Sequence, residues 1–157
     1  MPALEVPLRA PPGAPPSLPQ RWGFVSLSHS HGVGLMAWSP DPVGVDLERW
    51  DRAFASEALM GRYYAASEQR RIQQRPEGVR RHSVLEYWLI KEAAIKWQQG
   101  SIAKDLAHWV VEADGRSACH QVSGAQVFAH CRQLGPWRMA IVSAREQNLL
   151  GAKVCLG

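Results

Sequence analysis

Cysteine is scarce in this sequence, and long apolar runs are missing from it. The 157 residues include 3 cysteines, an odd number with no C-x-x-C motif, which argues against a disulfide framework and fits a reducing cytosol. No apolar run approaches the roughly 18–20 residues that a membrane-spanning helix needs. Residues 1–20 are rich in proline and lack the apolar segment of a signal peptide. We therefore expect a cytoplasmic protein without a membrane partner.

Motifs that would assign the chain to several other classes are also missing. There is no G-x-S-x-G element, and Gly32-Val-Gly34 lacks the third glycine and the following helix of a dinucleotide-binding fingerprint. The adjacent pairs Cys119-His120 and His130-Cys131 lack the C-x₂₋₄-C spacing of a zinc site. Nucleic-acid-binding surfaces usually interleave basic residues with aromatic ones. This sequence lacks such interleaving, so we expect no nucleic-acid partner.

The composition fits an ordinary globular domain with a basic surface. Hydrophobic residues make up 46% and charged residues 20% of the chain, close to the globular average. The 18 Lys and Arg residues outnumber the 14 Asp and Glu residues, which gives a net charge of +4. Arginines gather between residues 70 and 81. An acidic protein partner or a phosphorylated small molecule would suit this charge.

Hydrophobic periodicity predicts strands at both ends of the chain and helices between them. The proline-rich segment 2–20 is expected to be an extended arm. Strands are predicted at 22–28, 33–38, 43–48, 108–112, 126–132 and 137–143, with a turn at His31-Gly32. Helices are predicted at 52–64, 67–74 and 80–99, with Asp51 as an N-cap, Ser83 and Glu86 as a capping box and Gly100 after the last turn. This order predicts an α+β fold in which a largely antiparallel sheet packs on one long helix.

Carboxylates and lysines gather on two of these elements. Asp46 and Glu48 are two residues apart on a predicted strand, so both project from one face. Glu92 and Lys96 share a face of the long helix with Trp88 and its core stripe. Each pair taken alone is also compatible with a solvated surface. Together, three carboxylates suit Mg²⁺, and the lysines suit phosphate charge, so the pattern predicts a Mg²⁺-dependent enzyme acting on a phosphate or pyrophosphate.

These residues also carry a resemblance to a known family. The blocks are Ser26-Leu-Ser-His-Ser30, Val43-Gly-Val-Asp-Leu-Glu48, Tyr63-Tyr-Ala-Ala-Ser-Glu68 and Trp88-Leu-Ile-Lys-Glu-Ala-Ala-Ile-Lys96. In order and separation they resemble the signature blocks of the 4′-phosphopantetheinyl transferases of the Sfp type. The amino-acid sequence around Trp22 and Trp97 is similar to that of cyanobacterial HetI-like members. The resemblance covers roughly residues 20–145.

The resemblance implies a fold built from two related halves. Residues 43–157 would form a complete second-half phosphopantetheinyl transferase domain. Residues 1–42 would form the proline-rich arm and the closing hairpin of a first half that is shortened at the N-terminus. Two explanations of the shortening stay open: the recorded start is too late, or a homo-oligomer completes the site.

The resemblance also implies an activity and a set of site residues. A 4′-phosphopantetheine group would pass from coenzyme A to a serine of an acidic acyl or peptidyl carrier protein, releasing 3′,5′-ADP. Asp46, Glu48 and Glu92 would hold Mg²⁺. Glu92 would be the catalytic base, with Glu68 as a weaker candidate, and Lys96 would steady the pyrophosphate with support from Lys91. His29, with Ser28, would meet the nucleotide phosphates, whereas His31 is interpreted as a turn residue.

Two other functions remain alternatives at this point. The first is a metal-dependent phosphodiesterase or nuclease, because clustered carboxylates with lysine recur at such sites. The second is a non-catalytic fragment of the same fold that binds coenzyme A or a carrier protein without turnover.

Overall fold

The computed structural model describes residues 7–151 and 153–157, so residues 1–6 of the predicted arm and residue 152 lie outside the described residues. The strands are β1 (Phe24–Ser30), β2 (Val33–Ser39), β3 (Gly44–Arg49), β4 (Trp109–Val111), β5 (Ser117–His120), β6 (Gln126–Leu134), β7 (Trp137–Ser143) and β8 (Lys153–Leu156). The α-helices are α1 (Ser56–Tyr63), α2 (Ala66–Gln73), α3 (Glu77–Gln98), α4 (Ile102–Asp105) and α5 (Glu146–Gly151), and a short 3₁₀ helix covers Gln20–Trp22. The predicted α+β class is confirmed.

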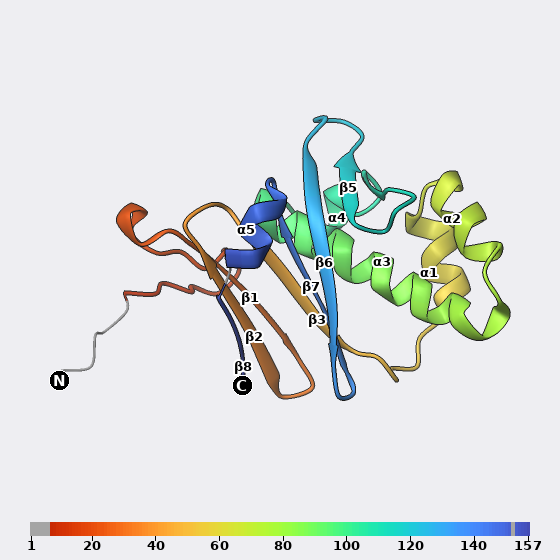
Figure 1. Ribbon diagram of the computed structural model, residues 1–157, viewed down its shortest axis with the longest axis horizontal. Coiled ribbons are helices and arrows are strands. Elements are labelled where there is room, and N and C mark those ends of the chain that lie inside the picture. Colours follow the sequence, from red (N-terminus) through yellow and green to blue (C-terminus); the bar gives the residue numbers. More distant parts are fainter. Residues whose placement is uncertain (1–6, 152) are drawn as a thin grey trace.

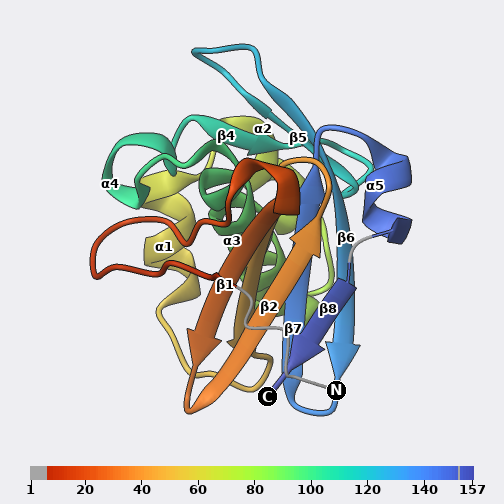
Figure 2. The ribbon, with the colours of Figure 1, turned by 90° about the vertical axis from the view of Figure 1, so that its left-hand side faces the viewer.

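The strands form two antiparallel sheets. The smaller has the order β1-β2-β8, and the larger has the order β3-β7-β6-β5-β4. Figure 1 shows the two sheets side by side, with α3 crossing one face of the larger sheet. Figure 2 looks onto the smaller sheet and shows the arm, in red, looping out beside the start of β1. The sheet packed on a long helix is therefore present, as the sequence predicts.

The packing of α3 on β3 sets the position of the candidate site. Gly44 opens β3, and a Cβ atom added to it would lie 1.9 Å from the carbonyl oxygen of Ala93 on α3. A larger residue at this position would push the helix away from the strand. Close approach thus brings the part of α3 that carries Glu92 and Lys96 over the face of β3 that carries Asp46.

A second, smaller core fills the space between the two sheets. It is formed by buried side chains of β2, β7, β3 and the residue before β3, namely Leu35, Ala37, Val43, Val45, Leu47 and Ile141. Alternation along β3 sends Val45 and Leu47 into this core while Gly44 and Asp46 face α3. β3 is consequently held on both faces, and its carboxylates stand on a rigid strand.

Three predicted helix signals are wrong. Asp51 does not cap α1, because the helix begins only at Ser56. The carboxylate of Asp51 accepts two hydrogen bonds from the guanidinium of Arg49 instead. Ser83 does not begin a helix: α3 starts at Glu77, and the Ser83 hydroxyl donates to the carbonyl of Val79 inside it. The left-handed residue that ends α3 is Gln99, with φ 57°, and not Gly100.

Several elements were not predicted. β5, α4, α5 and β8 are short, between 4 and 6 residues each. β5 reads Ser-Ala-Cys-His, which contains no β-branched or aromatic residue, and it is a strand because β4 and β6 pair with it on both sides. In the described part of the chain, no helix combines the length and the apolarity needed to cross a membrane.

Candidate active site

Serine side chains of β1 bind the open edge of β3. β3 is the outermost strand of the larger sheet, and alternate residues of β1 point toward it. The hydroxyl oxygen of Ser26 accepts the N–H of Val45 at 3.1 Å, and that of Ser28 accepts the N–H of Leu47 at 3.2 Å. These bonds satisfy backbone groups that would otherwise lack a strand partner. The serines therefore attach the smaller sheet to the strand that carries the carboxylates.

Asp46 is held between β1 and α3. Its Oδ1 accepts the hydroxyl of Ser28 at 2.7 Å and the ammonium of Lys96 at 2.7 Å. The Asp46 side chain is 8% exposed, whereas that of Lys96 is 31% exposed. Burial raises the pKa of Asp46, and Lys96 and the hydrogen bonds oppose this shift without cancelling it. Three predicted site residues from separate segments thus meet at one carboxylate oxygen.

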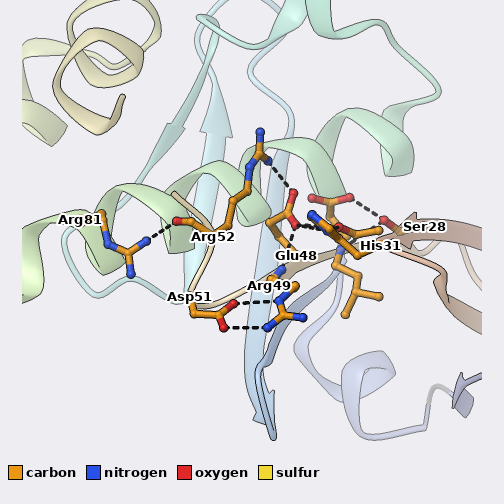
Figure 3. Close-up of polar contacts among 10 residues, drawn as sticks. Ser28, His31, Glu48, Arg49, Asp51, Arg52 and Arg81 are labelled. Atoms are coloured by element: carbon orange, nitrogen blue, oxygen red, sulfur yellow. Dashed lines mark hydrogen bonds and ion pairs between the residues drawn. The ribbon is translucent and has the colours of Figure 1, made fainter. Parts of the chain in front are cut away.

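Glu48 lies at the more open end of the same strand. Its Oε1 accepts the hydroxyl of Ser30 at 2.6 Å and the N–H of Arg49 at 2.9 Å, and its Oε2 accepts Nη1 of Arg52 at 2.5 Å. Burial by itself would raise the pKa of Glu48, but these bonds and the charge of Arg52 bring it below its usual value. Figure 3 shows Arg52 and His31 approaching Glu48 from different sides. Glu48 is therefore an ionised carboxylate.

Glu92 faces the strand carboxylates from α3. Burial is the main cause that raises its pKa to about 7, and the negative charges of Asp46 and Glu48 add to the shift, while Lys96 and Arg52 oppose it. The charges of Asp46 and Glu48 therefore act on Glu92, and Lys96 and Arg52 are the cations that oppose them.

The predicted set of Asp46, Glu48 and Glu92 fits Mg²⁺ in its chemistry. All three side chains offer oxygen ligands, and a hard cation would relieve the repulsion that raises the pKa of Glu92. Within residues 7–151 and 153–157, however, no three acidic, histidine or cysteine side chains stand at metal-binding spacing. Lys96 and Arg52 instead neutralise Asp46 and Glu48 directly. Residues of the chain itself thus compete with a cation for two of the three carboxylates.

Glu68 and Lys91 form a separate ion pair inside the fold. Both side chains are 0% exposed, and Lys91 Nζ lies 2.8 Å from Glu68 Oε2. Glu68 also accepts the N–H groups of Ala65 and Val111, each at 2.8 Å. Burial lowers the pKa of Lys91, and Glu68 opposes that shift. The structure therefore does not bring this pair into contact with Asp46 or Lys96; it joins α2, α3 and β4.

The two histidines of the hairpin differ from the expectation. His29 is exposed and, as a strand neighbour of Ser28, points to the opposite face of β1. His31, interpreted as a turn residue, occupies the turn with φ 47° but also contacts the site. Its Nδ1 lies 2.8 Å from the hydroxyl of Ser30 and 3.5 Å from Glu48 Oε1. The sequence does contain an indication of this contact. Ser28 and Ser30 lie on the same face of β1, and this face leads to the turn that His31 occupies.

Arg52 is a second contact that the sequence did not reveal. The sequence predicts Arg52 inside a helix at 52–64, whereas it lies in the segment before α1. Its backbone carbonyl accepts a hydrogen bond from the guanidinium of Arg81 on α3, as Figure 3 shows. This contact helps to hold the segment between β3 and α1 beside Glu48.

Two hollows flank the carboxylates. One, of about 340 Å³, is lined by Arg52, Phe54, Leu59, Arg62, Tyr63 and Trp88, among others. The other, of about 470 Å³, is lined by Lys96 and Trp97 of α3 together with the start of β1 and the arm. Arg52 and Lys96 each line one hollow and each hold one strand carboxylate. Each hollow is therefore bordered by one of the cations that hold the strand carboxylates.

The geometry agrees with a comparison against known protein families. The family described as the 4′-phosphopantetheinyl transferase superfamily matches residues 42–142, which is more than half of the chain. This span includes Asp46, Glu48, Glu92 and Lys96, while the serines of β1 lie before it. No curated protein matches the chain. The chain belongs to the 4′-phosphopantetheinyl transferase superfamily.

Proposed function

We propose that this protein transfers 4′-phosphopantetheine from coenzyme A to a serine of an acyl or peptidyl carrier protein, with Mg²⁺ bound. The observation that carries the proposal is the match of residues 42–142 to this superfamily, supported by the contact of Lys96 with Asp46. Coenzyme A is the substrate that the family uses, and a carrier protein is the acceptor that it implies. On the motif blocks, we assign the chain to the Sfp type.

The reaction exchanges one oxygen–phosphorus bond for another. The hydroxyl oxygen of the carrier serine attacks the β-phosphorus of coenzyme A, and the bond from that phosphorus to the bridging oxygen breaks. The new phosphodiester stays on the carrier, and 3′,5′-ADP leaves with the bridging oxygen. When bound, Mg²⁺ neutralises the pyrophosphate charge and orients it. Asp46, Glu48 and Glu92 are the residues that would hold the ion.

Glu92 is the residue we propose to accept the serine proton. Lys96 holds Asp46 and Arg52 holds Glu48, whereas the pKa of Glu92 is raised to about 7 in the protein without a metal ion, so Glu92 is the site carboxylate that takes up a proton most readily. Glu68, the other candidate, is completely buried, and both of its carboxylate oxygens accept hydrogen bonds. For Glu68 and Lys91 we therefore favour a role in positioning α3 over direct contact with coenzyme A.

Lys96 is the residue we propose to steady the pyrophosphate. Its side chain is partly exposed and borders the larger hollow, so it can turn from Asp46 to a phosphate oxygen. His29 stays the proposed contact of the nucleotide phosphates on the motif block alone, because its ring is exposed on the face of β1 opposite Ser28. Ser28 has both of its hydrogen-bonding roles occupied by Leu47 and Asp46, so we propose that it orients Asp46.

The smaller hollow is the place we propose for the carrier protein. Its floor is apolar, with Phe54, Leu59 and Trp88, and Arg52 and Arg62 lie at its margin. Acidic carrier helices would meet positive charge there, which favours encounter in the correct orientation. Because Arg52 also holds Glu48, this surface adjoins the carboxylates directly.

The decisive experiment incubates the protein with coenzyme A, Mg²⁺ and an apo carrier protein and reads the carrier mass. We expect the mass of one phosphopantetheine group to be added, with Mg²⁺ required. Glu92→Gln should lower kcat/KM by about 10²–10⁴-fold, the usual contribution of a general base. Glu77→Gln, in the first turn of the same helix, is the matched control and should leave the rate unchanged.

The rival functions give different results in the same assay. A fragment without turnover would bind coenzyme A but leave the carrier mass unchanged at every protein concentration. A metal-dependent phosphodiesterase or nuclease would show no affinity for coenzyme A. Either result would overturn the proposed transfer.

A further inference from the structure

The connection between β3 and α1 contains no helix or strand, yet one arginine side chain fixes its backbone. Residues 50–55 separate the last residue of β3 from the first residue of α1. Arg81, in the second turn of α3, donates one guanidinium nitrogen to the carbonyl of Arg52 and the other to the carbonyl of Trp50, the latter at 3.1 Å. Figure 3 shows the first of these bonds. One planar guanidinium thus bridges two carbonyls that lie two residues apart.

The backbone at Trp50 has further supports. Its indole stacks on the imidazole of His82, with ring centroids 4.2 Å apart and planes 8° from parallel. Its N–H donates to the carbonyl of Pro136 at 2.7 Å. In contrast, within the part of the chain that the structure describes, the carbonyl of Arg52 accepts a hydrogen bond from Arg81 alone. Loss of Arg81 should therefore loosen the connection at Arg52 more than at Trp50.

Fixing the backbone of Arg52 directs its side chain back to Glu48. Arg52 Nη1 lies 2.5 Å from Glu48 Oε2, although 43% of the arginine side chain is exposed. A long exposed side chain loses conformational entropy when it is held in one geometry, so such an ion pair is weak unless the backbone beneath it is ordered. Among the described residues, no hydrogen bond or ion pair joins Arg81 to Glu48. Arg81 therefore acts on this carboxylate through Arg52.

We propose that Arg81 is a positioning residue that keeps the guanidinium of Arg52 on Glu48 and thereby sets how readily Glu48 binds a cation. The inference rests on the proposed function, because that function makes Glu48 a metal ligand. With Arg81 in place, a cation must displace an arginine whose backbone is already ordered. Without Arg81, the side chain of Arg52 moves among several conformations and leaves the carboxylate open for a larger share of the time.

The first test observes Arg52 directly in the protein without metal. In NMR spectra of protein with isotope-labelled arginine, an ion-paired guanidinium gives N–H signals that exchange slowly with water, and Arg52→Gln identifies the signal of Arg52 by its disappearance. We expect this signal to be lost in Arg81→Met, which circular dichroism should show to be folded. An Arg52 signal that persists unchanged in Arg81→Met would overturn the inference.

Arg80→Met is the matched control for this substitution. Arg80 precedes Arg81 on the same helix, but its guanidinium donates to the carbonyl of Arg75 and not to the connection. The variant removes the same charge from the same region of α3, so the Arg52 signal should stay as it is in the parent. Loss of the signal in both variants would assign the effect to charge and would also overturn the inference.

The second test is a double-variant cycle that is measured as Mn²⁺ affinity in the absence of coenzyme A. Arg81→Met should tighten Mn²⁺ binding about two- to fivefold, the size expected of an exposed ion pair. Arg81→Met/Arg52→Gln should bind Mn²⁺ no more tightly than Arg52→Gln alone, because both substitutions remove the same contact. If the two effects multiplied, Arg81 would act independently of Arg52 and the inference would be wrong.

The outcomes also separate this inference from the proposed function. If the parent bound Mn²⁺ and modified the carrier protein while Arg81→Met matched the parent in both the NMR signal and the Mn²⁺ affinity, the inference alone would fail. If the parent bound no Mn²⁺ and left the carrier protein unmodified, the proposed function would fail, and the role given to Glu48 would fail with it.

Discussion

The ammonium of Lys96 lies 2.7 Å from Oδ1 of Asp46 and so joins the last turns of α3 to the middle of β3. The two residues are 50 positions apart in the sequence, and the hydroxyl of Ser28 shares the same carboxylate oxygen. A buried carboxylate with a partly exposed lysine is a pair that can open toward a ligand. In contrast, the pair of Glu68 and Lys91 is closed on all sides.

Replacing Lys96 should weaken the binding of coenzyme A. Lys96→Met keeps the length of the side chain but removes the charge at the border between Asp46 and the larger hollow. We expect the Kd for coenzyme A to rise about tenfold or more, because a charge-assisted contact contributes roughly 1.5–3 kcal/mol. Calorimetry measures this directly. Lys104→Met on α4 does not line the hollow and should leave the Kd unchanged; an equal effect of both would contradict a specific contact.

The raised pKa of Glu92 should make folding stability depend on pH. In metal-free protein, the folded-state pKa of about 7 exceeds the unfolded value of 4.5. At this group the folded state then binds more protons than the unfolded state between these values, so the contribution of Glu92 to stability is largest below pH 4.5 and is lost as pH rises through 7. The loss should reach about 3 kcal/mol, since one pKa unit is about 1.4 kcal/mol.

Urea unfolding at several pH values, with chelator present, checks this dependence. Glu92→Gln carries no titrating proton, so the difference in unfolding free energy between parent and variant should decrease steadily across the window. A constant difference from pH 4.5 to 7 would mean that Glu92 has an ordinary pKa. Glu77→Gln, at the exposed start of α3, removes a carboxylate away from the site and serves as the control.

The sequence predicted much of this architecture because the relevant patterns are local. Period-2 alternation located β1, β2, β3, β6 and β7, and period-3.6 spacing located α3. The same spacings placed Asp46 with Glu48, and Glu92 with Lys96. Helix ends were predicted less well, because Asp51 and Ser83 satisfy a capping pattern but bind Arg49 and Val79 instead.

Contacts between distant segments could not be predicted in this way. His31 reaches Glu48 because β1 lies in one register beside β3, which no local pattern encodes. Arg52 reaches Glu48 from four residues further along, because residues 50–55 form a connection and not the start of the predicted helix. The complete burial of Glu68 and Lys91 likewise depends on how α2 and β4 cover α3. The division of the chain at residue 42, with a complete second half after it, stays a prediction.

Breaking the ion pair of Glu68 and Lys91 should cost stability. Lys91→Met leaves the Glu68 carboxylate buried without its cation, so we expect a loss of about 3–5 kcal/mol. Urea unfolding measures it. The double variant Glu68→Gln/Lys91→Met removes both charges and should recover a large part of that loss. Asp51→Asn, which breaks the exposed pair with Arg49, should change the free energy of unfolding far less than Lys91→Met does.

The same double variant separates structure from catalysis. A positioning role predicts that Glu68→Gln/Lys91→Met, once folded, keeps most of the transfer rate at saturating coenzyme A. A rate as low as that of Glu92→Gln would instead identify Glu68 as the base. Circular dichroism at the assay temperature establishes that the variant is folded.

The serines of β1 should protect individual amides of β3. Ser28→Ala removes the acceptor of the Leu47 N–H, and Ser26→Ala removes that of the Val45 N–H. In each variant the freed amide should exchange hydrogen about two- to tenfold faster, since a net hydrogen bond contributes roughly 0.5–1.5 kcal/mol. Each serves as the control for the other. Exchange that rises equally at both amides in both variants would point to loss of the whole β1–β3 contact.

Removing the arginine that holds Glu48 should strengthen metal binding. Nη1 of Arg52 lies 2.5 Å from Glu48 Oε2, so a cation that takes Glu48 as a ligand must first displace the guanidinium. Arg52→Gln leaves Glu48 ionised, because the bonds from Ser30 and the N–H of Arg49 remain. We therefore expect Mn²⁺, used as a probe in the absence of coenzyme A, to bind a few-fold more tightly. An exposed ion pair contributes about 0.2–1 kcal/mol, which sets this size.

Titration followed by electron paramagnetic resonance gives the Mn²⁺ affinity without requiring turnover. Arg62→Gln is the matched control, because Arg62 lines the same hollow but stacks on Tyr63 and does not touch Glu48. Loss of its charge changes the field near the site without freeing a ligand. If the Mn²⁺ affinity of both variants rose by the same factor, general electrostatics would explain the effect. If Arg52→Gln alone gained, direct competition between Arg52 and the cation for Glu48 would be the cause, because only that substitution frees a carboxylate oxygen.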